Sequence, residues 1–247
     1  MIMILGCGVL FVVALGVIAR WSGMDLQPPT RADGSDAGSH HTKSVVARPV
    51  WYGWLVVVAG LIAGVLGAGA GGRLIMRLLA VTSPPSADGR TTEAEEVVGE
   101  ITVGGTLALF TFGGAFTGVL VAALYVLLYR WLPSGRLRGM TFGAFILVTF
   151  GWWLEPLRGS NPDFDIVGPG WLTVVALSAL ALVEGMLVAA VVGRLSRAVP
   201  MQVDAPPTSA LKSHRALVVG RIALVAAAVP CLPMFGLTVA DIMSRSP

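Results

Sequence analysis

The sequence predicts an all-α bundle of about six membrane-spanning helices. Hydrophobic residues make up 55% of the 247 residues, and charged residues only 13%. A typical soluble domain has about 25% charged residues. The mean hydropathy is +0.79, and the hydrophobic residues form runs about as long as a bilayer core is thick. These runs indicate a lipid-facing surface rather than the interior of a soluble protein.

Six hydrophobic segments are expected to cross the membrane as helices. The third is longer than a bilayer core requires, so we expect it to tilt or to break at Gly104 and Gly105. The fourth is short, roughly 24 Å at about 1.5 Å per residue. The segments are 1–19, 52–72, 101–129, 139–154, 171–192 and 216–240.

The polar stretches divide the chain around a predicted transmembrane core of four helices at 51–193. Residues 20–50 are rich in Ser, Gly, Asp and Pro and are predicted to form a disordered cytoplasmic linker. Residues 194–215 are predicted to form a cytoplasmic loop, and 216–247 the last helix and a short tail. Met24 is an alternative start, which would remove the first segment, 1–19, and leave five helices.

The basic residues predict the orientation. The first, third and fifth connections carry about twice as many Arg and Lys residues as the second, the fourth and the C-terminal tail, which places the odd connections in the cytoplasm. Only Lys43 and Lys212 are lysines among the 17 basic residues. This bias, with abundant Gly, Ala and Val, suggests a bacterial protein of the plasma (inner) membrane.

The second connection contains the largest predicted cluster of charges. Thr92 and Glu95 have the spacing of a capping box, which predicts a short external amphipathic helix near 92–102. Glutamates of this helix would then face two arginines one turn apart at the outer end of the second segment. The predicted external ion-pair cluster consists of Arg73, Arg77, Glu96 and Glu100.

Small residues recur at every fourth position in three segments. This spacing lets helix backbones approach closely in lipid, either within one bundle or between copies of the chain. The clearest predicted helix-packing ridge is Gly60, Gly64, Ala68 and Gly72, with similar series at Gly114, Gly118 and Ala122 and at Ala181, Gly185, Ala189 and Gly193.

Glu184 and Arg221 lie inside hydrophobic segments, where charge is costly. Their depths are similar, so we expect an intramembrane charged pair in which Arg221 is the partner of Glu184. A paired Glu184 would be a structural tie between helices. An unpaired Glu184 would suit a proton carrier, because a neutral carboxyl group is less costly to bury than a charged one.

No motif indicates catalysis, and no histidine falls in a hydrophobic segment, so we predict no enzyme activity, no catalytic residues, no metal and no cofactor. Oxygen-bearing side chains alternate at 161–165 but fit a turn better than a calcium loop. The leading hypothesis is an accessory or assembly component that acts by helix–helix association. The alternative is a small secondary transporter or proton-coupled permease using Glu184 and Arg221. Expected partners are the lipid bilayer and a second copy or a membrane complex, not nucleic acid.

Overall fold

Helices make up most of the chain that the structure describes. The computed structural model describes residues 2–31, 41–154, 156–203 and 213–245. Five helices in these ranges are long and apolar enough to cross a membrane, and another is apolar but shorter. The predicted class, an all-α bundle of about six membrane-spanning helices, is therefore confirmed. The chain is a multi-pass membrane protein.

Each predicted segment corresponds to one or more observed helices. The first is α1 (Ile2–Trp21), the fourth is α6 (Leu137–Phe150) and the fifth is α7 (Gly170–Ala198). The second is one long helix composed of α2 (His41–Gly64), a π-helical turn η1 (Val65–Gly69) and α3 (Ala70–Thr82). The third contains α4 (Val103–Ala108), the π-helical η3 (Leu109–Phe116) and α5 (Thr117–Leu128). The sixth is α8 (Ser213–Ala228) followed by α9 (Cys231–Arg245).

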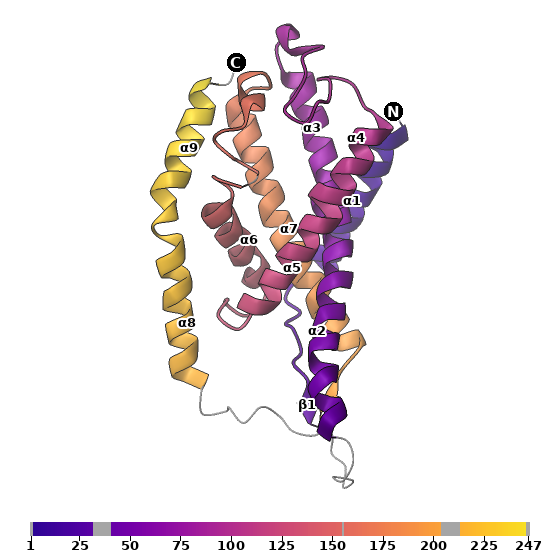
Figure 1. Ribbon diagram of the computed structural model, residues 1–247, viewed down its shortest axis with the longest axis vertical. Helices are drawn as coiled ribbons and strands as arrows, with labels where there is room; N and C mark the ends of the chain where they lie inside the picture. Colours follow the sequence, from indigo (N-terminus) through magenta and orange to yellow (C-terminus); the bar gives the residue numbers. More distant parts are fainter. Residues whose placement is uncertain (1, 32–40, 155, 204–212, 246–247) are drawn as a thin grey trace.

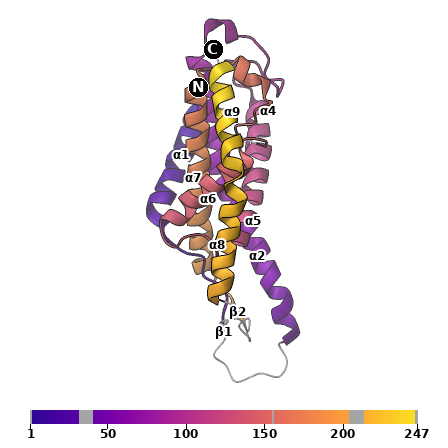
Figure 2. The same ribbon diagram turned by 90° about the vertical axis from the view of Figure 1, so that its left-hand side faces the viewer.

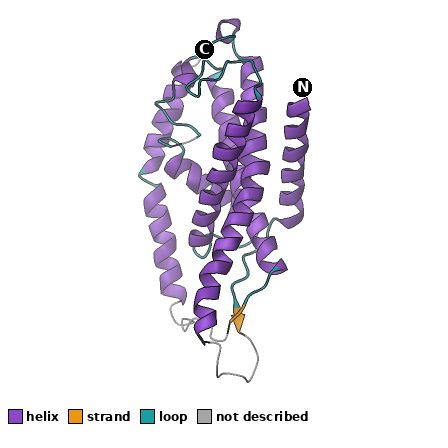
Figure 3. Cartoon of the chain, turned by 45° about the vertical axis from the view of Figure 1, so that its right-hand side comes forward, coloured by secondary structure: helices purple, strands orange, loops and turns teal. Residues whose placement is uncertain are grey.

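The remaining elements are short and lie in the connections. Two 3₁₀ turns are η2 (Pro85–Ala87) and η4 (Pro162–Asp165). The two-residue strands β1 (Thr30–Arg31) and β2 (Gln202–Val203) pair in parallel. Figure 3 shows that this pairing lies at one end of an otherwise helical molecule.

α7 is the central helix of the bundle. It packs on α6, α2, α1, α9, α5 and α3, and most of its C-terminal half is buried. The start of α1 and the end of α9 lie at the same end of the molecule, together with the second and fourth connections (Figure 1). α8 and α9 form one column along a flank of the bundle, which faces the viewer in Figure 2. The largest core cluster includes Leu55, Ala59, Ala63, Ala122, Tyr125, Phe142, Leu187, Val188 and Val192.

The glycine ridge of α2 packs within the chain, against η3 and α5. A Cβ added at Gly60 would meet backbone atoms of Val119 and Gly118, and one added at Gly64 would meet those of Gly114 and Gly118. The backbones of the two helices are therefore in direct contact, which side chains larger than hydrogen would prevent. The ridge of α7 is used in the same way, because Gly185 lies against Gly139 and Gly143 of α6.

α6 is too short to cross a bilayer alone, since its 14 residues span about 21 Å at about 1.5 Å per residue. Before α7 begins, the described residues 151–154 and 156–169 contain turns and η4 but no α-helix, and they are called the irregular segment. Leu157 and Phe164 of this segment are buried, with Phe235, Val239 and Ile242 of α9 in the same cluster. Irregular backbone is tolerated near a bilayer when protein covers it, and α9 supplies that cover.

Three sequence-based expectations about local structure differ from the observed structure. The third segment was expected to tilt or to break at Gly104 and Gly105. It does not break there, because both glycines lie in regular α4, and its distortion is η3. Residues 92–102 form no amphipathic helix. The Thr92 backbone N–H donates to the Glu96 carbonyl at 2.9 Å, and the Thr92 hydroxyl donates to the same carbonyl at 3.0 Å. Glu95 has a φ of 60°, so the chain closes a tight loop there instead of starting a helix.

The third expectation was disorder throughout 20–50, and it fails for the described part of that stretch. The Gln27 backbone N–H donates to the Ser196 hydroxyl at 3.0 Å, and Asp25 pairs with Arg138 at 2.7 Å. The strand β1 and the start of α2 also fall in this range. Residues 32–40 lie outside the described residues. Residues 194–198, predicted as loop, belong to α7.

The contact between α2 and α5 yields a stability prediction. Gly64→Ala should lower the free energy of unfolding by about 1–3 kcal/mol, because the added methyl group would force the two backbones apart. Gly53→Ala on the same helix is the control, since an added Cβ there meets nothing within 4 Å. It should be neutral or stabilising by about 0.5–1 kcal/mol. Thermal unfolding in detergent measures both, and equal stability of the two variants would contradict direct backbone contact.

The orientation is a separate prediction. In a background of Cys7→Ala and Cys231→Ala, Glu95→Cys should react with an impermeant thiol reagent in intact cells, and Arg136→Cys only after lysis. Both positions are exposed, so access to the reagent depends on the side of the membrane. The asymmetry of basic residues supports this orientation. The opposite labelling pattern would invert the topology.

Candidate functional site

Glu184 lies at the midpoint of α7, about 21 Å from each end of that helix at about 1.5 Å per residue. Its side chain is inside the bundle, and the residue is only 7% exposed. The Oε2 atom accepts a hydrogen bond from the backbone N–H of Ala68 at 3.0 Å. The Oε1 atom is buried and has no hydrogen-bond partner among the described residues. One of the two carboxyl oxygens therefore has a described hydrogen-bond donor and the other has none, at the middle of a membrane-spanning helix.

The hydrogen-bond donor to Glu184 belongs to a distorted stretch of helix. Ala68 lies in η1, a π-helical turn that joins α2 to α3. Such turns contain one more residue than an α-helical turn and are frequent at functional sites. Gly67 gives the carboxylate room, because an added Cβ there would overlap Oε2 of Glu184. The glycine-rich sequence of η1 thus lets the carboxylate reach the backbone.

A second π-helical stretch packs against the first. η3 contacts η1, and a Cβ added at Gly114 of η3 would lie 3.0 Å from the Gly64 carbonyl oxygen and 3.3 Å from Gly69 Cα. Two distorted backbones therefore lie in contact beside Glu184. π-helical turns are rare and are frequent at functional sites, so two of them in contact single out this region of the bundle.

The predicted pair between Glu184 and Arg221 is wrong. Arg221 is exposed on α8, and α8 packs on α6 and α9 rather than on the face of α7 that carries Glu184. Similar depth in the membrane suggested the pair, but depth does not define which helices are neighbours. Among the described residues Glu184 has no cationic partner, and a backbone N–H takes the place that the sequence suggested for an arginine.

Arg73 is the second buried charge in the membrane-spanning part. It lies on α3 and is 7% exposed. Its Nη2 donates to the Thr102 carbonyl at 3.4 Å, and its Nε is buried without a partner among the described residues. One turn further along α3, Nη1 of Arg77 donates to the Gly99 carbonyl at 3.0 Å. Both arginines therefore hold the backbone of the second connection.

The predicted external ion-pair cluster does not form between the residues that the structure describes. Glu96 accepts a hydrogen bond from the Thr102 hydroxyl at 2.8 Å, and Glu100 is exposed without a described ion pair. The predicted helix at 92–102 would have placed both glutamates on one face. The loop found there instead turns carbonyl groups toward Arg73 and Arg77.

The second and fourth connections are joined at the same end of the molecule. Arg158 pairs with Glu93, and the Glu93 backbone N–H donates to Asp163 at 2.7 Å. Asn161 accepts a hydrogen bond from the Asp163 N–H at 2.8 Å. The alternating oxygen-bearing side chains of 161–165 thus build a capped turn. Among the described residues no group of three or more His, Cys, Asp or Glu is placed to hold a metal ion.

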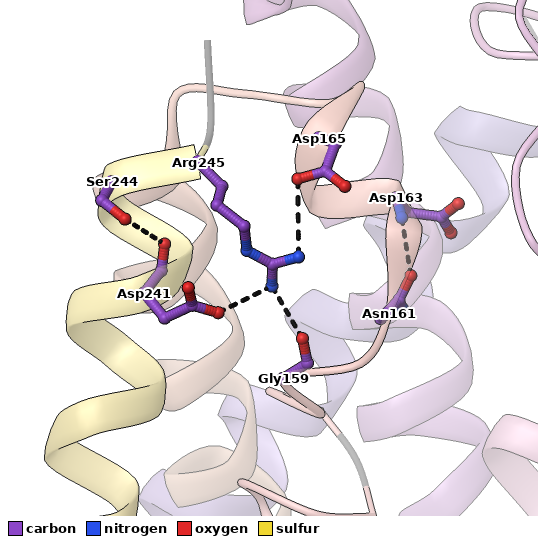
Figure 4. A network of polar contacts seen from close by, with 7 residues as sticks. All are labelled: Gly159, Asn161, Asp163, Asp165, Asp241, Ser244 and Arg245. Atoms are coloured by element: carbon purple, nitrogen blue, oxygen red, sulfur yellow. Dashed lines mark hydrogen bonds and ion pairs between the residues drawn. The ribbon is translucent and has the colours of Figure 1, made fainter.

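Figure 4 shows how the end of α9 joins this network. Nη2 of Arg245 donates to the Gly159 carbonyl at 2.7 Å. The same guanidinium pairs with Asp241 at 3.0 Å and with Asp165 at 3.5 Å. These contacts fix α9 over the irregular segment 151–169.

A small pocket at the other end of the bundle is separate from Glu184. It is lined by Asp25 and Arg138, which form an ion pair, and by the buried Tyr125. Met186 contributes the α7 wall of this pocket. At about 100° per residue, Met186 and Glu184 lie on nearly opposite faces of the helix. The pocket therefore does not open onto the carboxyl group.

The fold and this site define a multi-pass helical membrane protein with a buried carboxyl group at its centre, which forms no ion pair with any residue that the structure describes. No family model, no curated protein and no solved structure matches the chain. Sequence reasoning assigned Ala68 to the packing ridge and missed its role as the hydrogen-bond donor to Glu184. It also missed Gly67 of η1 and Gly139 and Gly143 of α6. Spacing of small residues does not distinguish a glycine that packs on a helix from one that admits a carboxylate.

The network that joins the second and fourth connections leads to a prediction about pH. Burial raises the pKa of Asp163 above its ordinary 3.8, and the Glu93 carboxylate acts in the same direction. The folded protein therefore binds this proton more tightly than the unfolded chain, so the charge of Asp163 costs stability above the raised pKa. This cost is relieved as the pH falls through the raised pKa toward the ordinary value.

Asp163→Asn should remove this pH dependence, because Asn keeps an oxygen to accept from the Glu93 N–H but cannot ionise. Thermal stability of wild type and variant at about pH 4 and about pH 7 is the measurement. Relative to wild type, the variant should gain stability at the higher pH. If the change in thermal stability between the two pH values is the same for wild type and Asp163→Asn, the prediction of a raised pKa for Asp163 is wrong.

Proposed function

We propose that the chain is a proton-coupled membrane transporter in which Glu184 binds and releases the proton. The observation that carries this proposal is the state of the Glu184 carboxyl group. It is buried at the middle of a membrane-spanning helix and has a single described hydrogen bond. An ionisable residue at such a depth costs about 2.5–3.5 kcal/mol on insertion scales and usually marks a functional pathway.

The two oxygens of Glu184 have different roles in this proposal. Oε2 is held by the Ala68 N–H, and Oε1 lacks a described partner. A proton on Oε1 would remove the charge without displacing the bond to Ala68. It would also weaken that bond, because a hydrogen bond to a charged acceptor is about twice as strong as one to a neutral acceptor. Protonation therefore changes the stability of η1.

A change at η1 would reach the outer end of the protein through α3. η1 connects α2 to α3, and α3 carries Arg73 and Arg77, which hold the second connection. If η1 changed from π-helical to α-helical hydrogen bonding, α3 would rotate and shift by one residue relative to α2. Proton binding at Glu184 is thereby coupled to the segment that covers the outer end of the bundle, as alternating access requires.

Packing of the glycines within one chain weakens the assembly hypothesis. Its main argument was the series of small residues, and Gly60, Gly64, Gly118 and Gly185 already pack on neighbouring helices of the same chain. We propose the bacterial plasma membrane as the location, on the basis of the lysine-poor composition and the distribution of basic residues.

The test is infrared difference spectroscopy of the protein in lipid as the pH is changed. Wild type should show a carboxyl C=O signal from a buried acid that Glu184→Gln lacks. Gln keeps an oxygen to accept from the Ala68 N–H, so the variant should remain folded. Arg221→Gln is the matched control and should keep the signal, because Arg221 is exposed. A full signal in Glu184→Gln would rule out Glu184 as the proton-binding residue.

A further inference from the structure

Arg73 is a buried cation that the proton site does not use. It lies on α3, within the membrane-spanning helix Ala47–Thr82, and is 7% exposed. The elements around α3 are α1, α7, η1 and η3. α1 carries no charged residue before Arg20, and η1 and η3 carry none at all. α7 carries the buried Glu184, which accepts from Ala68 and forms no described ion pair with Arg73. A full positive charge thus lies in a membrane-spanning helix without a described counter-ion.

The guanidinium has capacity for a further acceptor. Its Nε is buried without a partner, and its Nη2 makes one long bond, 3.4 Å, to the Thr102 carbonyl, among the residues that the structure describes. No described carboxylate lies within ion-pair distance of Arg73. Glu96, which could have neutralised it, instead accepts from the Thr102 hydroxyl. A buried positive charge without a described counter-ion favours the binding of an anionic ligand.

We infer that Arg73 binds a small monocarboxylate anion, which the protein carries together with the proton of Glu184. The inference rests on the proposed function, since the carried proton is the one at Glu184. The guanidinium is planar and presents parallel N–H groups that match the two oxygens of a carboxylate. One monocarboxylate neutralises one arginine, whereas a doubly charged phosphate would leave a net negative charge in the apolar interior.

The two sites are linked by one helix. Ala68, the donor to Glu184, precedes Arg73 by five residues, so the sites are separated by about 8 Å along the axis. A carboxylate and a proton together carry no net charge. Their joint movement therefore avoids the cost of taking an unbalanced charge across the hydrocarbon layer.

The second connection covers this site. The segment 99–102 is held by Arg77 at Gly99 and by Arg73 at Thr102. Arg77 lies one turn beyond Arg73 on the same face of α3. An incoming carboxylate would meet the outer arginine first and then replace the Thr102 carbonyl at the inner one. The two arginine bonds are the described hydrogen bonds that join this segment to α3, and the other bonds of Thr102 are local, to Glu96, Gly105 and Thr106.

The experiment measures binding of propionate to the full-length protein in detergent by its effect on thermal stability. Ionic strength is held constant, with chloride and phosphate as competing anions. Wild type should be stabilised in a saturable way by propionate and much less by chloride or phosphate. Arg73→Gln should bind at least about tenfold more weakly, because hydrogen bonds to a charged partner are lost. Arg73→Lys keeps the positive charge but not the planar guanidinium, so its affinity for propionate should lie between those of wild type and Arg73→Gln.

Arg90→Gln is the control, because Arg90 is an exposed arginine in the second connection. It should bind propionate as wild type does. Equal binding by wild type and Arg73→Gln, or equal stabilisation by chloride, would overturn the inference. The absence of any saturable propionate effect would also overturn it. If Arg73→Gln does not fold, Arg73→Lys is the variant that tests the inference. Propionate binding by Arg73→Lys with the affinity of wild type would contradict recognition of the carboxylate by the planar guanidinium.

The outcome can be separated from that of the proposed function. A buried carboxyl signal that depends on Glu184, without propionate binding, would leave the proton site intact and refute the anion site. Propionate binding that depends on Arg73, without a Glu184 signal, would refute proton coupling and with it the paired transport.

Discussion

A carboxyl group at the centre of a membrane-spanning helix must find its hydrogen-bond donors within the protein, because the surrounding hydrocarbon offers none. In this chain the donor is the backbone of the neighbouring helix, at Ala68. The backbone N–H groups of a regular α-helix are already used in its own hydrogen bonds. The distortion of the helix at η1 therefore accounts for the N–H group that is available to Glu184. The fold places them in contact by packing α7 against the long helix that contains η1.

Close packing of glycines makes this arrangement possible. Gly64 and Gly118 bring α2 and α5 into backbone contact, and Gly114 does the same for the two distorted stretches η1 and η3. Lipid provides little hydrophobic drive for helices to associate, so packing of this kind contributes much of the stability.

The sequence predicted the fold class well, since hydropathy and length are enough to identify membrane-spanning helices. It also identified the ridge of Gly60 and Gly64 as a packing surface. It could not identify the opposite helix, because many segments of this chain contain small residues. Glu184 was recognised by its position in an apolar run. The hydrogen-bond donor to Glu184 was not recognised, because every residue except proline has a backbone N–H and the sequence does not show which one is available. The loop at 92–102 was mistaken for a helix because Thr92 can bond a nearby backbone group in either structure.

The short helix α6 has a consequence for how the protein is made. The irregular segment 151–169 follows α6, and its buried side chains rest against α9. Ribosomes synthesise α9 long after this segment, so for some time during biogenesis Leu157 and Phe164 have no final cover. The membrane insertion machinery, or lipid itself, must shelter them during that interval. The arrival of α9, whose Arg245 donates to the Gly159 carbonyl, then covers these side chains.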